Sequence, residues 1–218
     1  RVGAPWLAVL RSAFSLHNET FNVWSHALPS AWLFAQTVRT LRDPRLHTWV
    51  QRSPAIVSAM GSFLFAVSAA SHLLCARSEK VACYCFACDK ASIAVFFWSC
   101  SVASSIFYFR KQRVPSYTAL LRNSAIVFNT ASCAFASYSI AMSSLGWTMS
   151  NARKVQILGS QVFGGLTPAI LEVLQSSDSQ TGSLILKHAG ISLSWAGAGA
   201  GFFVSFFPEK RWPGLFDK

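Results

Sequence analysis

The chain has 218 residues, of which 52% are hydrophobic and only 12% are charged, and its mean hydropathy is +0.38. A soluble domain carries about 25% charged residues, so this composition argues against a water-soluble protein and indicates that lipid surrounds much of the chain. The formal net charge is +11, but the basic residues stand in short clusters between apolar stretches, as at Arg153 and Lys154. Such clusters are typical of loops beside anionic lipid headgroups. We therefore expect membrane lipids as partners, and no nucleic acid.

Residues 1–21 form a juxtamembrane segment ahead of the first apolar stretch. The segment mixes aromatic residues and leucine with two arginines, Arg1 and Arg11. This mixture fits an amphipathic helix lying along the headgroup interface, and it fits an ordinary polar lead-in coil equally well.

Six mostly apolar stretches follow, each long enough to cross a bilayer as a helix, which takes about 20 residues. They cover residues 22–41, 54–75, 81–109, 116–145, 155–174 and 183–207. Short polar joints separate them, which predicts adjacent antiparallel helices. The sequence thus predicts an all-α fold, a polytopic transmembrane bundle over residues 22–207, with a further joint at 208–218. Lysine and arginine divide almost evenly between the two sides, so the positive-inside rule gives no orientation.

Small residues are dense in two of the predicted helices. In lipid, helices associate by close backbone approach, so small residues predict buried faces. The predicted faces contain Ala66, Ser68, Ala69, Ala70 and Ser71 in the second helix and Gly197, Gly199 and Gly201 in the sixth.

Three residues within the predicted helices are candidates for chemistry, because polar and ionisable groups in a membrane are costly and often functional. Ser68 and His72 share one face of the second predicted helix, since four residues separate them. Asp89 lies beyond a short joint, so two antiparallel helices can bring it to the depth of His72. Zinc accepts imidazole and carboxylate ligands, and a nearby hydroxyl or carboxylate can orient a ligand or a bound water. The same residues also fit a hydrogen-bonded cluster that only fixes helix packing.

Three motifs, in order along the chain, resemble the signatures of the progestin and adipoQ receptor family. The first is SLHNETFNVWSH at 15–26. The second combines Ser68 and His72 with SEK at 78–80 and with Asp89. The third is FPEKRWPGLFD at 207–217. Together these motifs span nearly the whole chain.

The resemblance implies a seven-helix membrane protein, of which this chain contains six helices and is expected to be a fragment. It implies a zinc ion as cofactor, bound by His72 and by two further histidines on the seventh helix, beyond Lys218. Ser68 and Asp89 would then be catalytic partners of the zinc-bound water. The resemblance also implies an integral, multi-pass protein of the plasma membrane.

The branches of this family imply different functions. The segment HALP at 26–29 looks more like the progestin branch, which implies a receptor that senses a steroid (progestin) or lipid-like ligand and signals across the membrane through a G protein or adaptor. The adiponectin-receptor branch implies a zinc-dependent ceramide amidase. A degenerate, non-catalytic membrane scaffold is a third hypothesis. Lys90 departs from the family pattern, which has tyrosine after the aspartate, and its ammonium group either pairs with Asp89 or turns away.

Overall fold

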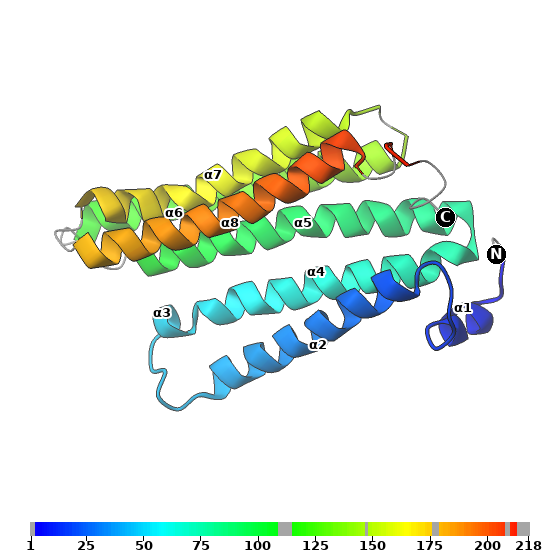
Figure 1. Cartoon of the computed structure of the whole chain (residues 1–218). Helices are drawn as coiled ribbons and strands as arrows, with labels where there is room; N and C mark the ends of the chain where they lie inside the picture. The colour runs from blue at the N-terminus through cyan, green and yellow to red at the C-terminus, as the bar shows by residue number, and fades with distance from the viewer. Residues whose placement is uncertain (1–2, 109–114, 147, 176–178, 208–209, 213–218) are drawn as a thin grey trace.

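The computed structural model of the chain describes residues 3–108, 115–146, 148–175, 179–207 and 210–212. Within these ranges six long helices run side by side and no strand is present (Figure 1). They are α2 (Thr20–Arg42), α4 (Pro54–Leu74), α5 (Glu79–Tyr108), α6 (Pro115–Ser144), α7 (Asn151–Gln175) and α8 (Ser179–Ser205). The predicted all-α bundle is therefore confirmed, and each helix matches its predicted stretch to within a few residues.

Three short elements complete the described part of the chain. They are α1 (Trp6–Ser12), α3 (Trp49–Arg52) and a 3-10 turn, η1 (Cys75–Arg77), that joins α4 to α5. Helix α1 occupies part of the juxtamembrane segment and is held at the end of α4, where the Gly3 N–H donates a hydrogen bond to the Arg77 carbonyl at 3.0 Å. The Arg77 guanidinium lies 5.4 Å from the centre of the Trp6 ring.

The helices alternate in direction along the chain. Helix α2 packs against α4, α4 against α5, α5 against both α6 and α7, and α7 against α8 (Figure 1). As a result, the first turns of α2, α5 and α7 lie at the same end of the bundle as the last turns of α4, α6 and α8. We call this end the site end, because the candidate residues lie there.

Small and polar side chains fill the contacts between helices, and large apolar side chains face outward. Ala94, Ser99 and Ser105 are 0% exposed, whereas Trp32 and Phe128 are 61% and 68% exposed. This distribution is the reverse of that in a soluble protein and suits a bundle whose solvent is lipid. The predicted small-residue face of α4 is confirmed only in part, because Ser68, Ala69 and Ser71 are buried whereas Ala66 and Ala70 are exposed.

The prediction of a buried glycine face on α8 is wrong. Gly197, Gly199 and Gly201 are all exposed. The reason is that α8 packs mainly against α7, so at these glycines no other helix is in direct contact with α8 among the described residues.

Three of the described helical segments have the length and hydropathy of a membrane span. They cover residues 49–77, 79–108 and 119–144, with mean hydropathies of 1.6, 1.5 and 1.4. These segments support the prediction of an integral membrane protein. The other long helices include more polar residues, such as Lys187 and His188 in α8.

Candidate functional site

A network of short hydrogen bonds shapes the chain just before α2. The Glu19 N–H donates to His17 Nδ1 at 3.1 Å, and the His17 N–H donates to Thr20 Oγ1 at 2.7 Å. The Thr20 hydroxyl in turn donates to the Ser15 carbonyl at 3.0 Å. Side chains that bond to nearby backbone groups in this way favour turns over continued helix. The turn places Glu19 at the N-cap of α2.

The Glu19 carboxylate forms a hydrogen bond with the candidate histidine on α4. Glu19 Oε2 lies 2.8 Å from His72 Nδ1 and accepts a second hydrogen bond from Asn22 Nδ2, also at 2.8 Å. The side chains of His72 and Glu19 are only 19% and 26% exposed. Because an ionised carboxylate only accepts hydrogen bonds, His72 Nδ1 is the donor. In the neutral imidazole, Nε2 then presents its lone pair to a ligand.

A second histidine, which the sequence did not single out, lies against the first. The rings of His26 and His72 have centroids 5.6 Å apart, and His26 also contacts the Phe65 ring at 5.7 Å. The Nδ1 atom of His26 is buried and has no hydrogen-bond partner among the described residues. A sequence signal for this contact does exist, since Glu19, Asn22 and His26 are spaced by three and four residues and so share one face of α2.

The structure brings Ser68, His72 and Asp89 to neighbouring parts of α4 and α5, without direct bonds between them among the described residues. Ser68 is buried one turn before His72. The His72 ring packs edge-on against Phe86 of α5 at 5.5 Å, and Asp89 follows Phe86 by one turn. The Asp89 carboxylate forms no hydrogen bond or ion pair within the described part of the chain. The catalytic roles of Ser68 and Asp89 stay predictions.

The surroundings of His72 fit one part of a zinc site. Histidines that bind metals almost always donate their other N–H to a carboxylate, carbonyl or water, and the Glu19–His72 pair has this arrangement. However, no group of three or more histidine, cysteine, aspartate or glutamate side chains in the described ranges is arranged to hold a metal ion. The described residues thus offer one oriented ligand and not a complete set.

Two hollows lie near these residues. A hollow of about 910 Å³ separates α1 from the end of α4 and is bordered by His17, Glu19 and His72. An apolar cavity of about 360 Å³, which we call the bundle cavity, lies among α5, α6, α7 and α8. Its apolar lining includes Phe97 of α5, Leu158 of α7 and Phe203 of α8.

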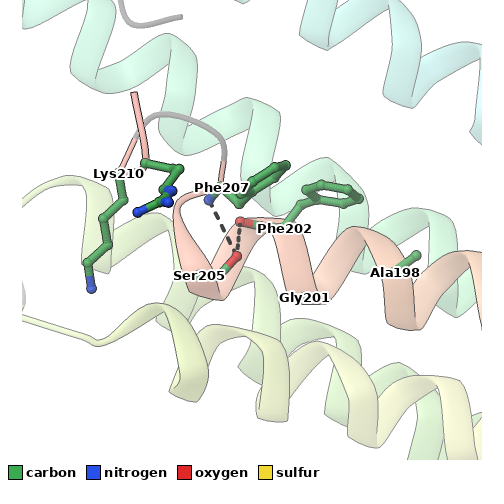
Figure 2. A pocket seen from close by; sticks show the side chains of 7 residues that line it. Ala198, Gly201, Phe202, Ser205, Phe207 and Lys210 are labelled. Carbon is green, nitrogen blue, oxygen red and sulfur yellow. Dashed lines mark hydrogen bonds between the residues drawn. The ribbon is translucent and has the colours of Figure 1, made fainter. Parts of the chain in front are cut away.

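A third hollow, of about 650 Å³, lies where α8 ends, and Figure 2 shows its side chains. Phe202, Phe207 and Lys210 border it, and the Ser205 hydroxyl closes the helix end by donating to the Phe202 carbonyl and accepting from the Phe207 N–H, both at 3.3 Å. The third sequence motif begins here. Its residues 208–209 and 213–217 lie outside the described residues.

Comparison with known proteins gives consistent matches along the chain. A sequence model of the family described as "Haemolysin-III related" matches residues 14–218. Membrane progestin receptor alpha of Homo sapiens is 25% identical over 216 residues, which cover 96% of this chain and 60% of that protein. Heptahelical transmembrane protein 1 of Arabidopsis thaliana is 26% identical over 216 residues, covering 95% and 63%. Progestin and adipoQ receptor family member 3 of Homo sapiens is 31% identical over 113 residues, covering 50% and 36%. The chain thus spans about 60% of the length of the first two relatives.

Proposed function

The chain belongs to the haemolysin-III-related family, and on this premise we propose that it is a membrane receptor that binds a steroid or lipid-like ligand in the bundle cavity. The expected relationship to progestin and adipoQ receptors is confirmed by the relatives it matches. The progestin named in one of those relatives supports a steroid as the first ligand to test. A plasma-membrane location and a G protein or adaptor as the signalling partner remain predictions.

The bundle cavity is the observation that carries this proposal. Its volume of about 360 Å³ falls within the range of small-molecule sites, about 300–1,000 Å³. Residues from α5, α6, α7 and α8 line it, so one ligand would contact four helices at once. A ligand shifts a conformational equilibrium only by its difference in affinity for the two states. A ligand that contacts all four helices has a different affinity for a state in which α8 has moved relative to the other three. It therefore shifts the equilibrium between the two states.

Two glycines on α8 provide a matched pair of variants to test the proposal. Gly199 lines the bundle cavity and Gly197 does not. A Cβ atom at either position would meet no atom within 4 Å, and neither backbone has a positive φ, so both accept a side chain. We expect Gly199→Phe to fill the cavity and weaken progesterone binding at least tenfold, and Gly197→Phe to leave it unchanged.

The measurement is saturation binding of radiolabelled progesterone to the protein in lipid nanodiscs, with thermal stability as a check on folding. A folded Gly199→Phe variant that binds as tightly as the unchanged protein would contradict the cavity as the binding site. If neither progesterone nor any other apolar probe binds the unchanged protein, the receptor proposal fails.

The Glu19–His72 pair favours a second candidate function, a zinc-dependent ceramide amidase. This pair is oriented as a metal-binding histidine requires. If the chain has this activity, His72→Ala abolishes ceramide hydrolysis, whereas His47→Ala, at an exposed position in the joint before α3, leaves it unchanged. Equal ceramide turnover by the His72→Ala variant and the unchanged protein would rule out the amidase.

A further inference from the structure

We propose that the bundle cavity selects an amphiphile with an anionic head, held by Lys90 and Lys154. This inference rests on the proposed function, since it names the chemistry of the ligand in the same cavity. Both lysines line the cavity, Lys90 from α5 and Lys154 from the first turns of α7. Both are half-buried at the site end of the bundle.

Neither ammonium group has an acidic partner among the described residues. Lys90 Nζ donates to the Ser144 hydroxyl at the end of α6, at 3.2 Å, and Lys154 Nζ donates to Asn151 Oδ1 at 3.4 Å. Both acceptors are neutral. The alternative in which Lys90 pairs with Asp89 is not the one the structure adopts, because the Lys90 side chain instead reaches the end of α6.

The charges around the cavity leave a positive excess. Lys90 and Lys154 border the same cavity, and Asp89 precedes Lys90 in the chain. Two lysines thus border the cavity beside one carboxylate, that of Asp89. Charged side chains within membrane helices are costly and normally pair with one another or with backbone carbonyls. An anionic group between the two lysines would supply the missing partner.

The rest of the cavity lining determines which kind of apolar body the ligand can have. Apart from the lysines, the lining of the cavity is apolar. It includes Ile93 and Phe97 on α5, Val162 on α7 and Ala196 on α8. The volume of about 360 Å³ is near the small end of the range for ligand sites, which suits one hydrocarbon chain or one steroid ring system. The ligand that fits this cavity therefore has a carboxylate, sulfate or phosphate attached to a single apolar body.

Pairs of probes that differ mainly in head charge test this inference. The first pair is oleate and oleyl alcohol, and the second pair is pregnenolone sulfate and pregnenolone. The dissociation constant of each probe is measured on the protein in nanodiscs. We expect the charged member of at least one pair to bind at least tenfold more tightly than its neutral partner. The pair that shows this preference identifies the body as a hydrocarbon chain or a steroid.

Lysine variants then assign the preference to the two ammonium groups. We expect Lys90→Met and Lys154→Met each to weaken binding of the charged probe about tenfold and to leave the neutral probe unchanged, because methionine keeps the apolar stem. Lys90→Arg should retain the preference. Lys187→Met is the matched control, at an exposed position on α8 that does not line the cavity.

The outcomes separate this inference from the proposed function. One outcome is that neutral probes bind, that Gly199→Phe blocks their binding, and that charged probes bind no more tightly. In that case the receptor proposal stands and the lysine inference is overturned. The inference is also overturned if both methionine variants bind the charged probe as tightly as the unchanged protein. If no probe binds at all, both proposals fail. Thermal stability of each variant shows whether a loss of binding reflects loss of the fold.

Discussion

At the scale of single residues, the contact between Glu19 and His72 joins the start of α2 to the end of α4. The sequence identified His72 because an imidazole inside an apolar helix is unusual, and spacing placed Ser68 on its face. Glu19 could not be found in the same way. It is 53 residues away from His72, and its position depends on the turn set by His17 and Thr20.

This pair predicts the effect of one substitution on stability. Glu19→Ala leaves His72 Nδ1 and Asn22 Nδ2 without their shared acceptor, and a part-buried hydrogen bond to a charged group contributes about 1–3 kcal/mol. We expect the free energy of unfolding, measured by titration with a denaturing detergent, to fall by about this amount. Glu79→Ala is the control, because Glu79 is exposed in the first turn of α5, and it should change little. Equal effects of the two variants would show that the Glu19–His72 contact does not stabilise the fold.

At the scale of helices, their number, order and approximate ends follow from the sequence, because each stretch combines high hydropathy with polar joints. The way the helices pack does not follow as directly. A small residue predicts close approach, but hydropathy alone cannot say which small residues meet a neighbour. The three glycines of α8 predicted to be buried, Gly197, Gly199 and Gly201, are exposed, whereas Gly164 and Gly165 of α7 lie in tight contacts with α6 and α5.

Gly165 marks a close approach of α7 to α5. A Cβ atom there would lie 2.6 Å from Ser101 Oγ and 3.4 Å from Ser101 Cα. Gly165→Leu should therefore push the two helices apart and lower the free energy of unfolding by about 1–3 kcal/mol, the usual cost of overpacking. Gly159→Leu on the same helix meets nothing within 4 Å at its Cβ and should be tolerated. Thermal unfolding in detergent micelles compares the two variants, and a Gly165→Leu protein as stable as Gly159→Leu would contradict the described packing of α5 and α7.

At the scale of the whole molecule, the bundle holds two sites at one end that differ in character. The Glu19–His72 pair lies on the α2–α4 side, and the bundle cavity with its lysines lies among α5, α6, α7 and α8. Composition predicts the surrounding lipid and the inward small residues. It does not predict the cavity, which depends on how far α8 stands from α5 and hence on the packing of α7 between them.

The most direct test of the receptor account is to map where a ligand binds. A photoreactive amphiphile would be cross-linked to the protein in nanodiscs, and the labelled peptides identified by mass spectrometry. The account predicts adducts on cavity residues such as Phe97, Leu158 and Phe203, which excess unlabelled ligand prevents. A second apolar groove, of about 500 Å³ among α2, α4 and α5, is lined by Leu33 and Phe107. Adducts confined to that groove, with the bundle cavity unlabelled, would contradict the account.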